Sequence, residues 1–154
     1  ENKLRPVNVG LLVQNIIEKW DAKLVRNDVK MVYQCEEELP MIAGDPRSLE
    51  QVFTNLISNA VEAMKSQNGG TLAIKIERAD ETNIKINVSD TGPGIPEEIL
   101  KNLFTPFVSF SLQGTGLGLA IIKEIIAAHN GKITVESFPG GTVFYITLPI
   151  AEGE

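Results

Sequence analysis

Two stretches of the chain repeat apolar residues at helical spacing. The first predicts a helix from Val9 to about Trp20 that ends before Asn27. In the second, Asp45 or Ser48 can cap a helix whose apolar positions follow an unbroken spacing of three and four residues. Those positions are Leu49, Val52, Phe53, Leu56, Ile57, Ala60, Val61 and Met64.

Alternating apolar and polar residues predict strands around these helices. One follows the first helix at 29–33, and the runs 72–76 and 84–88 suit a hairpin. A third helix is expected from Leu117 to His129, before a last pair of strands at 132–136 and 142–148.

The stretch from Thr91 to about Thr115 is rich in glycine and proline and contains only a short helical piece, near Glu97 to Leu103. A loop of that length inside a compact domain is usually a lid or a disordered insert.

These elements predict an α/β fold, a two-layer sandwich. One mixed, mainly antiparallel sheet of about five strands would be covered on one face by three helices, with a long lid beside it. The chain of 154 residues is long enough for one domain, 1–154, with a single core. A ligand would then lie between the helix layer and the lid.

The composition and charge of the chain limit the kinds of partner that we expect. The net charge is -6 and no cluster of lysine and arginine is present, which argues against nucleic acid as the main partner. No apolar run approaches the roughly 18 residues needed to cross a bilayer. The single cysteine, Cys35, is predicted at a buried strand position and favours a reducing, cytoplasmic compartment. The chain looks like a soluble piece of a longer protein.

A polar stripe runs beside the apolar face of the second helix. Asn55, Asn59 and Glu62 fall within about 60° of one another around the helix. A solvated helix edge is the simpler interpretation. However, Ala60 and Ala63 beside Asn59 are small enough to admit a flat ligand, and a carboxamide oxygen is a suitable ligand for Mg²⁺.

Asp90 ends a predicted strand directly before Gly92 and Gly94. An aspartate in this context often only initiates a turn. Alternatively, a carboxylate at a strand end can accept a hydrogen bond from the exocyclic amine of adenine, which is worth about 1.5–3 kcal/mol. Guanine would present an oxygen at that point and be repelled.

A second glycine-rich turn, from Gly114 to Ala120, precedes the third helix. Its glycines would let the backbone approach a phosphate closely, and the start of the helix offers unpaired N–H groups. Such turns also occur for packing reasons. The ordered combination of this turn with Asn59 and Asp90 is much more specific for a metal-bound nucleotide.

Four segments resemble the conserved boxes of sensor histidine kinases, in order and with typical spacing. Asp45 to Met64 resembles the N box, Asp90 to Pro96 the G1 box, Phe104 to Phe107 the F box, and Gly114 to Ala120 the G2 box. The end of the chain, 140–149, is similar to the last strand of that family. The chain is therefore identified as a member of the family, over nearly its whole length.

The resemblance implies a Bergerat-type ATP fold with ATP and Mg²⁺ as ligands. Asn59 would bind Mg²⁺, Asp90 would recognise adenine, and the segment between Gly94 and Gly114 would form a mobile lid. The further nucleotide contacts that we expect are Asn55, Glu62, Ala63, Gly92, Gly94, Ile95, Leu119 and Thr142 around the base and metal, and Lys101, Thr115, Gly116, Leu117 and Gly118 near the phosphates.

Two residues decide what kind of reaction this chain supports. ATP-hydrolysing members of the wider superfamily carry a water-activating glutamate four residues before the metal-binding asparagine, where this chain has Asn55. The only histidine, His129, lies at the end of the third helix in surroundings unlike a phosphoacceptor box, and a partly positive ring there would suit the helix dipole. The resemblance places the acceptor histidine on a dimerisation domain that is absent from the chain.

The resemblance thus implies the donor half of a two-part kinase, with that dimerisation domain and a response regulator as partners. The alternative is a nucleotide-binding module that switches conformation without transferring phosphate. It stays open because the lid lacks the lysine common in this subtype and has Ser109-Phe110-Ser111 instead. Lys101 could move toward the phosphates in its place, or Mg²⁺ and backbone amides could suffice.

Two further interpretations remain open at the lid and the helix stripe. Many relatives carry a lysine where this chain has Glu62, which could help to hold metal or water or could simply be solvated. Phe104, Phe107, Val108 and Phe110 either pack the lid onto the core or contact the dimerisation helices when nucleotide leaves.

Overall fold

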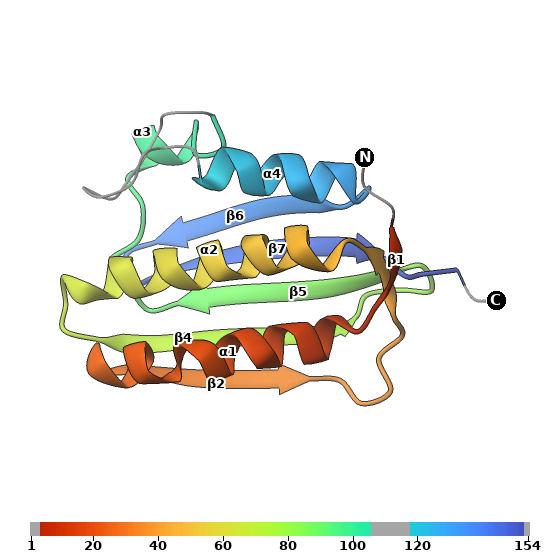
Figure 1. Cartoon of the computed structure of the whole chain (residues 1–154). Helices are drawn as coiled ribbons and strands as arrows, with labels where there is room; N and C mark the ends of the chain where they lie inside the picture. Colours follow the sequence, from red (N-terminus) through yellow and green to blue (C-terminus); the bar gives the residue numbers. More distant parts are fainter. Residues whose placement is uncertain (1–3, 106–117, 153–154) are drawn as a thin grey trace.

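One sheet of five strands carries its helices on a single face (Figure 1). The computed structural model describes residues 4–105 and 118–152. Three helices lie against the sheet: α1 (Val9–Arg26), α2 (Pro46–Lys65) and α4 (Gly118–Ala128). The two-layer α/β sandwich predicted from the pattern is therefore confirmed. A fourth, short helix, α3 (Glu97–Leu100), lies within the long connection after the sheet's middle strand.

The sheet is mixed, as predicted. Its strands follow the order β2-β4-β5-β7-β6, and only β2 and β4 are parallel neighbours. Parallel neighbours need a crossover connection, and here α2 lies within it. The strands are β2 (Val29–Cys35), β4 (Gly70–Arg78), β5 (Asn83–Asp90), β6 (Lys132–Phe138) and β7 (Gly141–Pro149).

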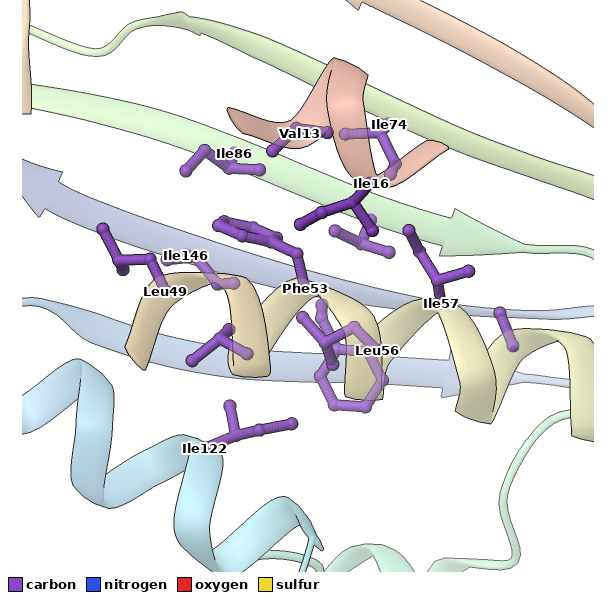
Figure 2. Packing of buried hydrophobic residues seen from close by; sticks show 14 of the residues in the cluster. Val13, Ile16, Leu49, Phe53, Leu56, Ile57, Ile74, Ile86, Ile122 and Ile146 are labelled. Atoms are coloured by element: carbon purple, nitrogen blue, oxygen red, sulfur yellow. The ribbon is translucent and has the colours of Figure 1, made fainter. Parts of the chain in front are cut away.

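The core lies between α2 and the sheet. All eight apolar positions predicted for this helix are buried, because their spacing turns them toward one side. Figure 2 shows Phe53 among Val13 and Ile16 of α1 and Ile86 of β5. Fully burying a side chain of this size contributes about 1.5–3 kcal/mol, so this one helix face fixes how α2 lies on the sheet.

Two short strands were not predicted. β1 (Arg5–Val7) and β3 (Ile42–Gly44) form a separate antiparallel pair, and Ile42 also bridges to Ile150 beyond the end of β7. Three residues are too few to show an alternating pattern, so the sequence carried no usable signal for them.

The prediction of a buried Cys35 was wrong. Cys35 is the last residue of β2, which is an edge strand, and its thiol is exposed. The helix boundaries were close: Asp45 occupies the N-cap position of α2, although its side chain accepts from the Ser48 hydroxyl (2.8 Å) instead of from a backbone N–H.

None of the helices in the described parts of the chain is long and apolar enough to span a membrane.

Candidate nucleotide-binding site

A pocket lies between α2 and the ends of β5 and β7 where Asp90 and Thr142 are paired. Its wall combines side chains from three stretches that are distant in sequence, 56–63, 88–95 and 142–144. The sheet and α2 supply apolar surface, and three polar side chains interrupt it. The lining residues are Leu56, Asn59, Ala60, Ala63, Val88, Asp90, Gly94, Ile95, Thr142 and Phe144.

Asp90 is the polar group at the centre of the sheet side. It is the last residue of β5, and its Oδ1 accepts a hydrogen bond from the Gly92 N–H (2.8 Å). Burial raises the pKa of the Asp90 carboxyl, and the hydrogen bond from Gly92 offsets part of that shift. No described residue donates to Oδ2, so this oxygen can accept from a bound molecule.

Gly92 and Gly94 hold the loop after Asp90 close to its neighbours. A Cβ at position 92 would lie 2.9 Å from Asp90 Oδ1 and 3.3 Å from the Ala63 Cβ. Gly94 has a φ of 93°, and a Cβ there would lie 2.4 Å from the Phe138 carbonyl oxygen. A side chain at either position would therefore force the loop or these neighbours to shift.

α2 supplies the opposite wall through Asn59 and Ala63. The carboxamide of Asn59 lies one helical turn from the small Ala63 side chain, and both line the pocket with Asp90. Asn55 is half-buried on the same helix but does not line the pocket.

Glu62 is not brought to the pocket either. It lines a separate groove between the C-terminal ends of α1 and α2, with Trp20 and Lys23 among its neighbours. Its carboxylate lies 3.6 Å from the Lys65 ammonium group. Glu62 is about 100° from Ala63 around the helix, which is enough to turn it to the far side.

The segment that follows α3 packs against the pocket from outside. Leu103 is buried in the core, and the Phe104 ring meets the pocket residue Phe144 edge to face, with centroids 6.4 Å apart. The Lys123 ammonium group of α4 lies 5.6 Å from the centre of the Phe104 ring. For Phe104, the structure therefore favours the packing interpretation. Lys101 is exposed beyond the end of α3.

At the start of α4, Gly118 is half-exposed and Leu119 is buried. Neither lines the pocket. The other predictions for the phosphate end and the lid fall outside the described residues: Thr115, Gly116 and Leu117, together with Gly114, Phe107, Val108, Ser109, Phe110 and Ser111.

His129 is buried at the far end of α4, where only 1% of it is exposed. The Asp45 N–H donates to Nε2 (3.0 Å), so the ring proton lies on Nδ1, which donates to the Ile125 carbonyl (2.8 Å). A structural role is thus supported, but the expected partly positive ring was wrong: the ring is neutral and joins the start of α2 to α4.

Comparison with known proteins shows which family the chain belongs to. The model of histidine kinase-, DNA gyrase B- and HSP90-like ATPases matches residues 44–152. The chain belongs to this family. The sensory histidine kinase/phosphatase NtrB of Rhodobacter capsulatus is 44% identical over 136 residues, which cover 80% of this chain and 38% of that protein. The chain therefore spans well under half the length of this relative.

Three solved structures of histidine kinases are similar to this chain over nearly its whole length. The catalytic domain of histidine kinase ThkA matches with a TM-score of 0.86 and 30% identity over 98% of this chain and 100% of that one. Full-length ShkA in complex with AMPPNP gives 0.86 and 28% over 99% and 32%. ThkA in complex with the response regulator TrrA gives 0.81 and 28% over 96% and 42%. Over nearly its whole length the chain is thus similar to the catalytic domains of histidine kinases.

Sequence reasoning missed three apolar members of the pocket and one polar neighbour. Leu56, Val88 and Phe144 were assigned to the core or not singled out, because apolar periodicity does not distinguish a core position from a pocket wall. Ser137 of β6, which bonds to Ile95 and Thr142, was also missed. The alternation of β6 predicts that Ser137 lies on the face toward the helices. The sequence did not show that the loop with Ile95 would pack beside it.

Proposed function

We propose that this chain binds Mg-ATP in the pocket and donates the γ-phosphoryl group to a histidine on a separate dimerisation domain. The observation that carries the proposal is the placement of Asp90 and Asn59 on opposite walls of one small pocket. A carboxylate and a carboxamide are the two groups needed for the base and the metal, respectively.

Adenine fits the sheet side of the pocket. Oδ2 of Asp90 would accept from the exocyclic amine, while the Gly92 N–H holds Oδ1 and so fixes the plane of the carboxylate. The Thr142 hydroxyl, beside Asp90 in the sheet, would bond to a ring nitrogen directly or through water. Ala60, Ala63 and Val88 would then contact the faces of the flat ring.

Magnesium fits the side of α2. Asn59 offers a neutral oxygen, and Mg²⁺ normally keeps several waters and phosphate oxygens in its octahedral shell. In the described parts of the chain, His, Cys, Asp and Glu form no group of three that could hold a metal ion. A metal held by Asn59 would therefore depend on the nucleotide phosphates for most of its ligands. Bound there, it would neutralise charge on the transferring phosphoryl group.

The phosphoacceptor should lie outside this chain. His129 is buried, and both of its ring nitrogens are engaged in hydrogen bonds, so it cannot attack a phosphorus atom. Asn55, where hydrolytic relatives have a glutamate, lacks a useful proton-accepting pKa and disfavours direct transfer to water. The name of NtrB and the complex of ThkA with TrrA support a histidine acceptor and a response regulator as partners.

A conformational switch without phosphotransfer is the second candidate. It is favoured by the exposed position of Lys101, which places no cation at the pocket wall. Mg²⁺ and backbone amides would then have to supply all of the charge neutralisation. Phosphotransfer by this chain would likewise depend on Mg²⁺ and backbone amides to neutralise the charge of the phosphates.

Mixing the chain with γ-labelled ATP and a separately expressed dimerisation domain of a histidine kinase separates the two candidates. Dimerisation domains of NtrB-type kinases are the first to try. Label on histidine that requires Mg²⁺ supports transfer. At ATP concentrations that do not saturate the unmodified chain, the Asp90→Asn variant should strongly reduce labelling, and His129→Gln, if folded, should leave it intact. Binding of ATP without any labelled histidine across the acceptor domains would instead favour the switch.

A further inference from the structure

We propose that Ser137 is a positioning residue that ties together two walls of the nucleotide pocket and sets the direction of the Thr142 hydroxyl. The inference rests on the proposed nucleotide-binding function. Ser137 does not line the pocket itself, so its effect would be transmitted through Ile95 and Thr142.

Ser137 is the point where three separate segments meet. Its Oγ accepts from the Ile95 N–H at 2.7 Å, and its proton can be donated either to the Gly141 carbonyl at 3.3 Å or to the Thr142 Oγ1 at 2.9 Å. Ile95 belongs to the loop after β5, and Thr142 belongs to β7. One hydroxyl therefore links the loop wall to the sheet wall.

The loop wall is the segment of Gly94 and Ile95. It is a single stretch of chain between the pocket and an outer groove, and the bond to Ser137 fixes its backbone. Gly94 and Ile95 line the pocket on one side, and on the other they line an outer groove with Ser137 and the half-exposed Phe138. Ile95 is half-buried and packs against the core, which holds the loop through its side chain. The bond from the Ile95 N–H to Ser137 anchors it to β6 at the point where it passes Asp90.

Ser137 also decides what the Thr142 hydroxyl can offer. If Ser137 donates to the Gly141 carbonyl, Thr142 donates to Ser137 and presents only lone pairs to the pocket. If Ser137 donates to Thr142, the Thr142 proton is available to an acceptor on the ligand. The pair can thus serve as a donor or an acceptor toward a purine edge without moving a heavy atom.

Removing the Ser137 hydroxyl should therefore weaken binding at the base end of the nucleotide. Calorimetry on the whole chain should show that Ser137→Ala binds both ATP and adenosine about tenfold more weakly. That is roughly the effect of losing the hydrogen bonds of one hydroxyl group. Ser137→Thr, which retains the hydroxyl, should stay within about twofold of the unmodified chain. Thr134→Ala removes an exposed hydroxyl from the same strand and is the matched control.

A spectroscopic readout reports the tether directly. In nucleotide-free protein, the Ile95 amide proton should move to higher field in Ser137→Ala and stay in place in Ser137→Thr and Thr134→Ala. If Ser137→Ala does not fold, Ser137→Cys has nearly the same shape with a weaker acceptor, and it should show a smaller loss in the same direction.

The outcomes separate this inference from the function on which it rests. Failure of the unmodified chain to bind ATP would overturn the proposed function and this role of Ser137 with it. Normal ATP binding by the unmodified chain, together with equal affinity in a folded Ser137→Ala or Ser137→Cys, would overturn only the role of Ser137. An equal loss in Thr134→Ala would also overturn it, because the effect would then belong to the strand in general.

Discussion

Asp90 is half-buried beside α2 and His129 is buried at the end of α4, and the two differ in how many hydrogen bonds they make within the described protein. Both ring nitrogens of His129 have partners within the protein. Asp90, a lining residue of the pocket, accepts from Gly92 through one carboxylate oxygen, and no described residue donates to the other.

This contrast separates a structural group from a binding group. A buried polar group that is fully bonded stabilises the fold and has nothing left to offer a ligand. A half-buried carboxylate with few donors costs stability in the empty protein, and a ligand that donates to it can recover that cost on binding. The two residues should therefore give opposite results when they are replaced.

His129→Ala should produce the largest change. It leaves the Asp45 N–H and the Ile125 carbonyl without partners and opens a cavity, which should lower the free energy of unfolding by about 3–5 kcal/mol. Urea denaturation measures this. Glu124→Ala, at an exposed position on the same helix, should have almost no effect. If ATP affinity fell as much in folded His129→Ala as in Asp90→Asn, the contrast would be lost.

Asp90→Asn should weaken ATP binding about 10- to 100-fold, because it removes a charged hydrogen-bond acceptor worth about 1.5–3 kcal/mol. The unfolding temperature of the empty protein should stay the same or rise, since an asparagine can keep the bond from Gly92 without a buried charge. Calorimetry and thermal denaturation give the two quantities. Asp80→Asn, at an exposed turn, is the control and should leave ATP affinity unchanged. Unaltered affinity in Asp90→Asn would refute the adenine assignment.

Asn59→Ala should weaken the binding of the metal and leave the binding of the adenine base unchanged. We expect affinity for Mg-ATP to fall about tenfold, while affinity for ATP measured with a chelator changes little. Glu62→Ala, one turn away in the other groove, should bind both forms normally. Metal-stimulated binding that survives in Asn59→Ala would contradict the role of Asn59.

The pH dependence of stability should show the smallest effect. Because burial raises the pKa of Asp90, the folded state holds its proton to a higher pH than the unfolded state does. The stability of the unmodified chain relative to Asp90→Asn should therefore fall as pH rises from the ordinary carboxyl pKa through the raised one, and level off above it. Asp80, whose pKa is lowered by hydrogen bonds from Thr82, should show the reverse slope against Asp80→Asn. Denaturation curves across acidic pH test both.

The fold was predictable where a period was long enough to be read. The regular spacing of α2 identified every one of its buried positions, and the sheet strands could be placed by alternation. β1 and β3 escaped because each has only three residues, and their pairing depends on contacts across the whole chain. Cys35 was misplaced because alternation predicts a face but does not show that a strand lies at the edge of the sheet.

The candidate site was predictable where chemistry and local pattern coincide. Asn59, Asp90 and Thr142 meet in one pocket, as expected from the motifs. Glu62 did not, because a modest rotation around a helix carries a side chain to another groove, and sequence spacing alone does not give the direction of the pocket. Ser137 could not be assigned because its role depends on a loop that returns from 42 residues away.

The small β1–β3 pair has a mechanical consequence. β3 receives β1 on one side and Ile150 on the other, and the Ala151 N–H bonds to the Met41 carbonyl (2.8 Å), so both described ends of the chain attach to the same short strand. β7 runs from Thr142 at the pocket to this junction (Figure 1). Tension applied at the two ends would load β3 first, and the hydrogen bonds around Asp90, at the opposite end of the sheet, would bear force only after that junction had parted.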